Sequence, residues 1–264
     1  EFAKEVCQSL DVPLSKAEVK RFSDGEISVQ ISESVRGRDV FIIQSTGAPS
    51  NDNLMELLIM TDALRRSSAD SITAVVPYFG YARQDRKAAP RVPITARLVA
   101  DMYETAGIDR VVTIDLHAGQ IQGFFDIPVD HLDSTVIFIP YIKSLQTPDL
   151  VLAAPDVGAT KRVREFAKFL GTEMVICDKA RKRANEIASM TVIGDVAGKD
   201  VVLIDDICDT ANTLCKAAAL IKEQGAKSVR AVCTHPVLSG KAYENLENSV
   251  LEEIILCDTI PIKP

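Results

Sequence analysis

Eight short apolar runs, rich in Val, Ile and Leu, alternate along this chain with stretches that have the residue spacing of helices. The runs are 40–44, 72–76, 111–114, 150–153, 174–177, 201–204, 229–233 and 254–257. The helical stretches are 53–66, 93–106, 161–170 and 213–224. Runs without a polar break predict strands buried on both faces, which is typical of parallel sheets. The alternation therefore predicts an α/β fold with mostly parallel sheets flanked by helices.

The second half of the chain repeats parts of the first. Residues 38–45 align with 199–206, residues 71–77 with 228–234, and residues 1–4 with 165–168. Three matches in the same order, roughly 160 residues apart, indicate a duplicated α/β domain. We place the two domains at residues 1–135 and 136–264. In the second copy a strand precedes the helix that matches the start of the chain, so we expect the first strand of the N-terminal domain to precede Glu1.

The composition is that of a soluble globular protein, with 47% hydrophobic and 25% charged residues. No apolar run approaches the roughly 18 residues that span a membrane. The net charge of −7 does not favour a nucleic-acid surface, so a phosphate-bearing ligand would need local cations or a metal. Six cysteines without a CxxC pair predict reduced, mostly buried thiols, as in a cytoplasmic protein.

The stretch VVLIDDICDTANTL at 201–214 carries the strongest sign of a ligand site. The buried strand predicted at 201–204 ends in an acidic pair, and a short polar turn leads into the helix predicted from Thr213. Backbone N–H groups and the helix dipole favour an anion at such a turn, while paired carboxylates suit ribose hydroxyls or Mg²⁺. An ordinary N-capped turn remains the alternative. The residues involved are Asp205, Asp206, Asp209, Thr210, Ala211, Asn212 and Thr213.

Other polar residues follow further predicted strands. His117 lies two residues after Asp115 at a strand end, and Asp156 follows another strand with Gly158 close behind. The carboxyl ends of parallel strands are where α/β sheets bind ligands, so His117 and Asp156 are candidate metal ligands. His131 and His235 are not part of such a group, and we expect them to be structural. Residues 178–183, DKARKR, include four cations and are predicted to follow the strand 174–177 as a loop. This loop is either a solvated face or an anion site.

Two further loops stand out. Residues 22–26, FSDGE, read as a hairpin turn around Asp24–Gly25. Residues 77–87, PYFGYARQDRK, combine aromatic and basic residues after a strand and continue through two prolines. They are either a solvated loop or a mobile arm that stacks an aromatic base and meets a polyphosphate.

The longer motifs resemble those of class I ribose-phosphate diphosphokinases, the phosphoribosyl pyrophosphate synthetases. They are FSDGE, NDNLMELL, PYFGYARQD, RVPITA, DLHAGQIQGFFDIPVD, ANE, VVLIDD and CDTIP, and they extend over almost the whole sequence. The loop at 205–213 is also similar to that of type I phosphoribosyltransferases. The resemblance implies two phosphoribosyltransferase-like domains, in agreement with the internal repeat.

The resemblance also implies a reaction and a site. The diphosphoryl group of ATP would pass to the C1 hydroxyl of ribose 5-phosphate and release AMP. Lys179 would be the principal catalytic residue, aided by Arg181, which also contacts ribose 5-phosphate together with Asp205, Asp206 and residues 209–213. His117 and Asp156 would lie at Mg²⁺–ATP. The ATP site would consist of Arg83 and Gln84 with Phe22, Asp24, Gly25 and Glu26 of a neighbouring subunit. The implied assembly is a homo-oligomer, commonly a hexamer, in the cytoplasm.

The chain departs from the family pattern at a few positions. Asn212 replaces a usual Gly, and we expect it to adopt the positive φ of that turn. Ala159 and Ala180 replace Gly and a basic residue, and the arm between Arg86 and Arg91 is about one residue short. Two alternatives to an active synthetase are a type I phosphoribosyltransferase and a non-catalytic regulatory homologue. The retained cations Lys179 and Arg181 argue against the latter.

Overall fold

The structure, a computed structural model, describes residues 1–183 and 186–262, and at 179–183 and 186–189 it describes the backbone alone. The chain divides into two compact units, unit 1 at Glu1–Leu132 and unit 2 at Asp133–Pro264. Domain limits at 135 and 136 stay a prediction. Among the described helices, none combines the length and the apolar character required to cross a membrane. Both units are α/β, as expected from the alternating pattern.

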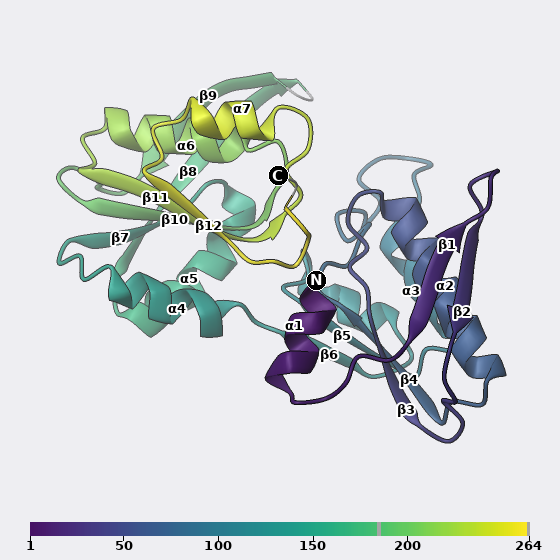
Figure 1. Ribbon diagram of the computed structural model, residues 1–264. Helices are drawn as coiled ribbons and strands as arrows, with labels where there is room; N and C mark the ends of the chain where they lie inside the picture. Colours follow the sequence, from purple (N-terminus) through teal and green to yellow (C-terminus); the bar gives the residue numbers. More distant parts are fainter. Residues whose placement is uncertain (184–185, 263–264) are drawn as a thin grey trace. The chain divides into compact units, whose positions relative to one another are not determined.

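Unit 1 holds a sheet of four parallel strands in the order β3–β4–β5–β6 and a separate antiparallel hairpin, β1–β2. Figure 1 shows α2 and α3 beside the sheet, with the hairpin lying next to α2. The elements are α1 Phe2–Ser9, β1 Ala17–Arg21, β2 Ile27–Ile31, β3 Asp39–Ile43, α2 Ser50–Arg66, β4 Ser71–Val76, α3 Thr95–Ala106, β5 Arg110–Ile114, η1 Gly119–Phe124 and β6 Val129–Leu132.

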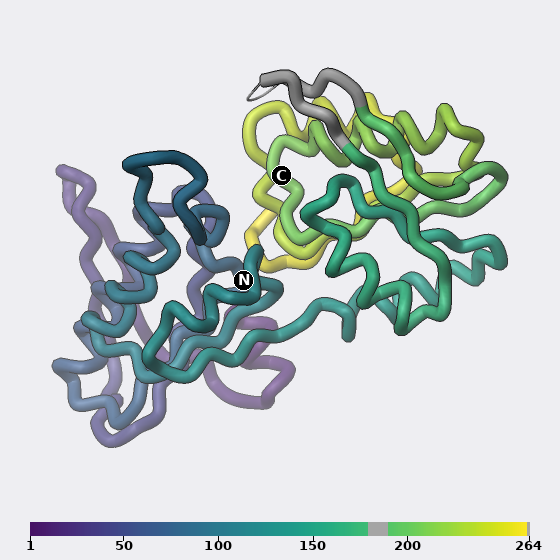
Figure 2. The backbone as a smooth tube through the Cα atoms, turned by 180° about the vertical axis from the view of Figure 1, so that it is seen from behind, coloured from purple at the N-terminus to yellow at the C-terminus, as the bar shows by residue number. Residues whose placement is uncertain are grey.

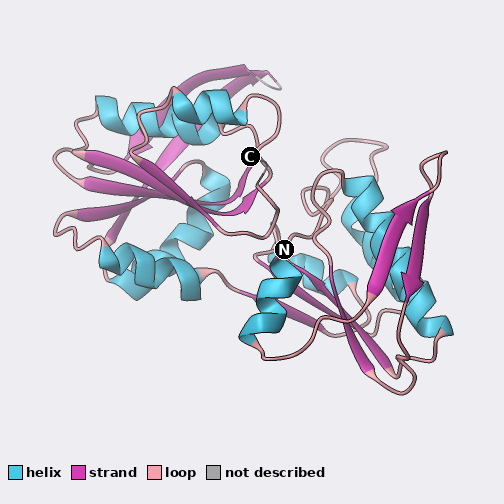
Figure 3. Ribbon diagram, in the orientation of Figure 1, coloured by secondary structure: helices cyan, strands magenta, loops and turns pink. Residues whose placement is uncertain are grey.

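Unit 2 holds a six-stranded sheet in the order β12–β11–β10–β7–β8–β9, parallel except for β9. Helices α6 and α7 cover one face, and α4 and α5 cover the other (Figures 1 and 3). The elements are α4 Thr135–Ser144, β7 Leu150–Ala154, η2 Val157–Ala159, α5 Thr160–Leu170, β8 Glu173–Arg183, β9 Glu186–Ile193, β10 Asp200–Cys208, α6 Asn212–Glu223, β11 Ser228–Pro236, α7 Ala242–Glu247 and β12 Glu253–Leu256.

Strand β10 is buried on both of its faces, as its sequence predicts. Val201 and Leu203 pack into the core beneath α6, whereas Val202 and Ile204 pack into the core beneath α5. None of these four side chains is more than 2% exposed. Burying one such side chain contributes about 1.5–3 kcal/mol. Because its side chains enter both cores, the strand joins the two helical layers.

All eight strands and all four helices expected from the sequence are present, but several boundaries differ. Strand β10 does not stop at the acidic pair; it continues to Cys208 because Asp205 and Ile207 still pair with β11. The cations at 178–183 are not a loop. They continue β8, because this segment pairs with β9 in an antiparallel hairpin that the apolar pattern does not reveal.

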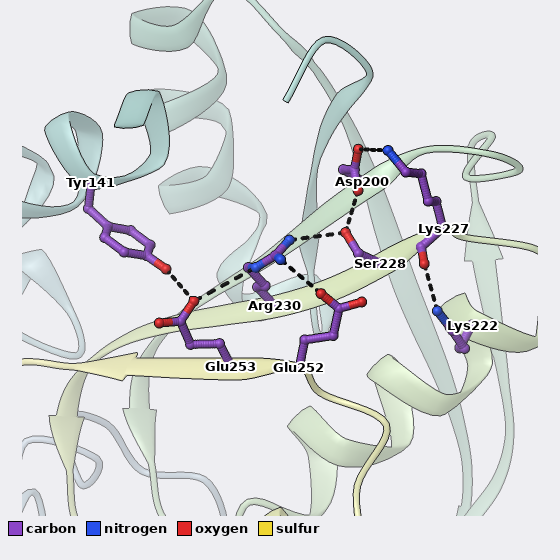
Figure 4. A network of polar contacts seen from close by, with 8 residues as sticks. All are labelled: Tyr141, Asp200, Lys222, Lys227, Ser228, Arg230, Glu252 and Glu253. Atoms are coloured by element: carbon purple, nitrogen blue, oxygen red, sulfur yellow. Dashed lines mark hydrogen bonds and ion pairs between the residues drawn. The ribbon is translucent and has the colours of Figure 1, made fainter. Parts of the chain in front are cut away.

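The amino ends of three strands in unit 2 are tied together by a polar network (Figure 4). The carboxylate of Asp200, at the start of β10, is only 4% exposed. It accepts hydrogen bonds from Ser228 Oγ at 2.5 Å and from Lys227 Nζ at 3.2 Å. These contacts lower the pKa of Asp200, the Ser228 hydrogen bond most of all. Arg230 extends the network to Glu252, at 2.8 Å.

All six cysteines are free thiols. Cys177, Cys208 and Cys233 are buried, whereas Cys7, Cys215 and Cys257 are only half-buried, so the expectation of mostly buried thiols holds for three of the six. Burial raises the pKa of Cys177 to about 11 and that of Cys208 to about 12. These two buried thiols therefore stay protonated near neutral pH.

Candidate active site

The turn between β10 and α6 is the central feature of unit 2. Asp209 and Thr210 follow the last strand residue, and α6 begins at Asn212. The first turn of a helix presents backbone N–H groups toward its open end, where they attract anions. The side chains of Asp209 and Thr213 are half-buried and that of Thr210 is exposed. The turn thus places hydroxyls, carboxylates and a helix N-terminus together, as predicted.

The positive backbone angle in this turn falls on Ala211, not on Asn212. Ala211 has φ 59° and precedes the helix, while Asn212 is already its first helical residue. The expectation for Asn212 was wrong because the helix begins one residue earlier than the sequence suggests. A left-handed conformation costs an alanine about 1–2 kcal/mol. Ala211 is only 5% exposed, so its buried methyl group offsets part of that cost.

Three carboxylates of unit 2 interact electrostatically at the carboxyl edge of the sheet. Burial raises the pKa of Asp205 well above its usual range, and the charges of Asp206 and then Asp156 raise it further. The Asp206 N–H donates to Asp205 Oδ1 at 2.9 Å, which opposes the rise. This cluster of like charges favours the arrival of a cation.

Asp156 is fixed by its own turn. Its Oδ1 accepts hydrogen bonds from the N–H groups of Gly158 at 2.9 Å and Ala159 at 3.3 Å, at the start of η2. A Cβ on Gly158 would lie 3.0 Å from that carboxylate oxygen, so glycine suits the close approach. Ala159 is buried and donates its N–H to Asp156, and its methyl group is accommodated in the core beneath α5.

Unit 1 contains a pocket of about 480 Å³. It brings together Arg83 and Gln84, both predicted site residues, with residues at the start of α2. Its lining residues are Pro49, Ser50, Asn51, Asp52, Tyr78, Tyr81, Arg83 and Gln84. Gln84 is fixed there, because its Oε1 accepts a hydrogen bond from Thr95 Oγ1 at 2.5 Å and its N–H donates to the Tyr81 carbonyl at 2.9 Å.

The first part of the expected arm is not exposed. Tyr78 and Phe79 are buried, and Phe79 makes edge-on contacts with Tyr103 and Phe125, with ring centroids 5.8 Å apart in both pairs. The excursion from 77 to 94 can be followed in Figure 2 between β4 and α3. Tyr81, with φ 65°, donates its hydroxyl hydrogen to Asn51 Oδ1. Of the aromatic residues in the expected arm, Tyr81 alone is partly exposed.

His117 is exposed and follows the end of β5. The preceding Asp115 is 2% exposed and has φ 41°, a conformation that strains a non-glycine residue. His117 belongs to unit 1 and its expected companion Asp156 to unit 2. His131 accepts a hydrogen bond from the Leu116 N–H at 2.9 Å through Nε2, in agreement with a structural role.

Residues 22–26 form the turn of the β1–β2 hairpin, as predicted. The Phe22 N–H donates to the Glu26 carbonyl at 2.9 Å, and Gly25 has φ 96°, which glycine adopts without strain. Phe22 is 59% exposed, an unusual position for a large apolar ring. Lys179 and Arg181 belong to β8. The structure describes their backbone, and their side chains are outside the part of the chain that it describes.

The contacts of some residues at these sites could not be predicted from the sequence. Asn51 lies within the quoted NDNLMELL motif, but its contact with Tyr81 becomes visible only in three dimensions. Ser239 donates its hydroxyl hydrogen to Asp209 Oδ1 from a segment 30 residues away. Asp115 stands out in the sequence only as the neighbour of His117, although it is the buried and strained residue of the pair.

Both ends of the chain match known family profiles. Residues 1–107 match the N-terminal domain of ribose phosphate pyrophosphokinase, and residues 171–264 match a phosphoribosyl synthetase-associated domain. The ribose-phosphate pyrophosphokinase of Campylobacter jejuni is 65% identical over 263 residues, which are 100% of this chain and 85% of the relative. That of Helicobacter pylori strain 26695 is 59% identical, covering 99% of this chain and 82% of the relative.

A solved structure gives the same answer. The crystal structure of phosphoribosylpyrophosphate synthetase from Mycobacterium smegmatis is similar, with a TM-score of 0.94 and 44% identity. The match covers 99% of this chain and 86% of the other. The fold of the chain agrees with that of the solved structure, and its sequence agrees with the named relatives over almost the whole length. The chain belongs to the ribose-phosphate pyrophosphokinase family.

Proposed function

We propose that the turn between β10 and α6 binds ribose 5-phosphate and that the pocket of unit 1 takes part in binding ATP. The observation that carries the proposal is the turn itself. Residues 209–213 join a helix N-terminus with two threonine hydroxyls, which suits a phosphate. Asp205 and Asp209 provide acceptors for ribose hydroxyls. Arg83 and Gln84 line the pocket that we assign to ATP.

As a member of this family the chain is an enzyme, a transferase of nucleotide biosynthesis. It transfers the diphosphoryl group of ATP to the C1 hydroxyl of ribose 5-phosphate and gives 5-phosphoribosyl 1-diphosphate and AMP. In this step the C1 oxygen bonds to the β-phosphorus while the bond to AMP breaks. A phosphoribosyltransferase or a non-catalytic homologue agrees less well with relatives that are named pyrophosphokinases over the whole chain.

We propose that Mg²⁺ binds together with the substrate phosphates, and that His117 of unit 1 and Asp156 of unit 2, each at the carboxyl end of a strand, are candidate ligands for it. Hard oxygen ligands suit Mg²⁺, which commonly binds one or two carboxylates together with substrate phosphates. The mutual repulsion of Asp156, Asp205 and Asp206 supports a cation near them. Among the described residues, no three acidic, His or Cys side chains are grouped so as to hold a metal without substrate. When bound, the ion would neutralise phosphate charge.

We assign the catalytic role to Lys179, with Arg181 as its partner and as a contact for ribose 5-phosphate. Negative charge develops on the transferred group and on the leaving AMP, and positioned cations stabilise it. Because the whole chain has a net charge of −7, the cations that stabilise this negative charge have to be local ones, and we propose Lys179 and Arg181 for this role.

We further propose that the active form is a homo-oligomer in the cytoplasm, a hexamer in the family pattern. The exposed Phe22 and the turn residues Asp24, Gly25 and Glu26 would complete the ATP site of a neighbouring subunit. The hairpin supports this because it presents an aromatic ring that can stack on a base.

The deciding measurement is AMP release from ATP by the full-length protein. We expect AMP to form only when both ribose 5-phosphate and Mg²⁺ are present. No AMP under these conditions would refute the enzyme assignment.

A second measurement tests the assigned catalytic residue. Lys179→Ala should lower kcat by roughly a hundredfold or more, because a preorganised charge at the reacting centre contributes at least that much. The exposed Lys168 of α5 provides the matched control, and Lys168→Ala should retain full turnover. Equal turnover in the two variants would remove Lys179 from its role.

A further inference from the structure

The turn between β10 and α6 is held in place by a separate segment, which we call the brace, residues 238–245. The side-chain amide of Asn245 in α7 donates to the carbonyl oxygen of Thr210 at 2.8 Å. Ser239 donates through its hydroxyl to Asp209 Oδ1 and through its N–H to the Asp209 carbonyl, the latter at 3.0 Å. Leu238 donates its N–H to the Cys208 carbonyl at 3.0 Å. Three successive residues, the last residue of β10 and the first two of the turn, thus accept hydrogen bonds from the brace.

Asn245 also contacts the helix that follows the turn. The Cys215 thiol donates to the backbone carbonyl of Asn245 at 3.4 Å. Figures 1 and 3 show α7 beside α6 on the same face of the unit 2 sheet. One residue of α7 therefore holds the chain on both sides of Ala211, at Thr210 before it and at Cys215 after it.

Such a clamp is needed because the turn is strained. Ala211, at φ 59°, occupies a region that alanine avoids, and a strained residue persists only where its surroundings fix it. The Thr210 carbonyl and the Ala211 N–H belong to one peptide unit. The bond from Asn245 to that carbonyl therefore fixes the direction of the N–H at the mouth of α6.

We propose that Asn245 is a positioning residue for the ribose 5-phosphate site. Its side-chain amide holds the Thr210–Ala211 peptide in the orientation that receives the phosphate. Ser239 acts in the same way on Asp209, by fixing one of its carboxylate oxygens. The inference rests on the proposed function of residues 209–213.

The test compares two asparagines of the same helix region. Asn248 Nδ2 donates to the Glu244 carbonyl within the same helix region at 2.7 Å, so Asn248 supplies the matched control. Asn245→Leu should raise the KM for ribose 5-phosphate roughly fivefold to tenfold, the effect of one lost hydrogen bond. The KM for ATP should not change. Asn248→Leu should change neither value.

A charged variant separates the effect of the hydrogen bond from that of electrostatic repulsion. Asn245→Asp loses the same donor, so we expect it to raise the KM for ribose 5-phosphate at least as much as Asn245→Leu. The proposal is overturned if only the Asp variant has an effect, because repulsion of the phosphate would then be the cause. It is also overturned if Asn248→Leu raises the KM for ribose 5-phosphate as much as Asn245→Leu does, since general damage to α7 would explain both.

A measurement without turnover completes the test. Saturating ribose 5-phosphate should raise the unfolding temperature of the wild type and of Asn248→Leu, and it should raise that of Asn245→Leu less at the same concentration. An equal increase in all three proteins refutes the role of Asn245. Wild-type activity keeps the two hypotheses apart: absent AMP formation refutes the proposed function, whereas an active wild type with unchanged variants refutes only the inference.

Discussion

Asp205 is held in the folded chain beside Asp206 and Asp156, and its pKa is raised chiefly by burial and further by their charges. A carboxyl group with a raised folded-state pKa destabilises the fold once it must ionise. The free energy of unfolding therefore falls as the pH rises from the pKa of an unfolded-state aspartate, about 3.9, toward the higher pKa of Asp205 in the folded state. A residue suited to binding ribose thus weakens the empty protein.

Replacing Asp205 by Asn keeps the shape of the side chain and removes its charge. We expect Asp205→Asn to unfold at a higher temperature than the wild type at pH 7–8, and the difference to shrink as the pH falls toward about 4. Calorimetry across this range measures it. The exposed Asp149 gives the control, since Asp149→Asn should show no such trend. A variant less stable than the wild type at pH 8 would contradict the assignment.

Gly80 illustrates a constraint of space. A Cβ at this position would lie 2.4 Å from the backbone carbonyl oxygen of Thr46, closer than real contacts allow. Gly80→Ala must displace the turn that leads to Arg83 and Gln84. We expect it to lower the free energy of unfolding by about 1–3 kcal/mol, as overpacking does, and to raise the KM for ATP.

Another glycine separates this effect from the general effect of adding a methyl group. A Cβ on Gly123 would have no atom of a non-adjacent residue within 4 Å, so Gly123→Ala should leave both quantities nearly unchanged. Urea unfolding and steady-state kinetics on the two variants make the comparison. Similar losses in both would show that the close contact at Thr46 is not the cause.

At the scale of elements, the two ends of β10 have different tasks. Its carboxyl end carries the acidic pair, and its amino end is fixed by the network around Asp200 and Arg230 (Figure 4). Burial, and next the neighbouring Glu253, raises the pKa of Tyr141 to about 12, so its hydroxyl stays protonated and donates to Glu253 at 2.7 Å. The contacts that stabilise the strand therefore lie at the end opposite to the one that we propose for ligand binding.

Arg230→Met tests this separation. Arg230 is 23% exposed and contacts Ser228 at 3.1 Å and Glu252 at 2.8 Å. Its loss should lower the free energy of unfolding by about 1–2 kcal/mol and leave both KM values and kcat unchanged. A fall in turnover without a fall in stability would contradict this view.

A surface ion pair provides the comparison. Lys20 and Glu18 pair at 2.7 Å, but both side chains are more than half exposed. Because exposed pairs contribute little, Lys20→Met should alter the unfolding midpoint far less than Arg230→Met.

The sequence predicts elements better than their ends. Apolar runs identify the eight strands because burial on two faces demands continuous hydrophobicity. They do not reveal β9, whose pairing with β8 is a matter of hairpin geometry, nor the continuation of β10 through Asp205 and Asp206, which depends on pairing with β11. Strand length is decided by neighbours as well as by composition.

The same limit applies to the candidate site. Residues 205–213 stand out because their acidic and hydroxyl side chains are close together in the sequence, whereas Arg83 and Gln84 are indicated only by the resemblance to the family, and the roles of both sets stay predictions. The shift of the positive φ from Asn212 to Ala211 could not be predicted, since the exact start of α6 depends on tertiary packing. The contact of Asn245 with Thr210 joins residues 35 positions apart. No local pattern predicts such a contact.

At the scale of the whole molecule, the proposed sharing of the ATP site between subunits can be tested by complementation. Asp24→Ala and Lys179→Ala should each be nearly inactive alone. In mixed oligomers, some sites would receive an intact hairpin from one subunit and an intact Lys179 from the other. With random equal mixing, up to about a quarter of wild-type activity should return.

The mixing experiment has a simple control and an outcome that would contradict the proposal. Two batches of Lys179→Ala mixed with each other should regain nothing. If Asp24→Ala and Lys179→Ala also regain nothing after the subunits have exchanged, the hairpin and the lysine serve the same subunit.

The burial of β10 on both faces has a consequence for how unit 2 opens. Its central amides pair with β7 on one side and β11 on the other, so they should be the last to exchange hydrogen with solvent. Neither helical layer can melt alone, because Val201 and Val202 anchor different layers through one backbone. Cooperative unfolding in one step should follow. The turn between β10 and α6 therefore begins in what should be the slowest-exchanging part of the unit. Any adjustment to the ligand that we propose for it would occur at its other end, beside α7.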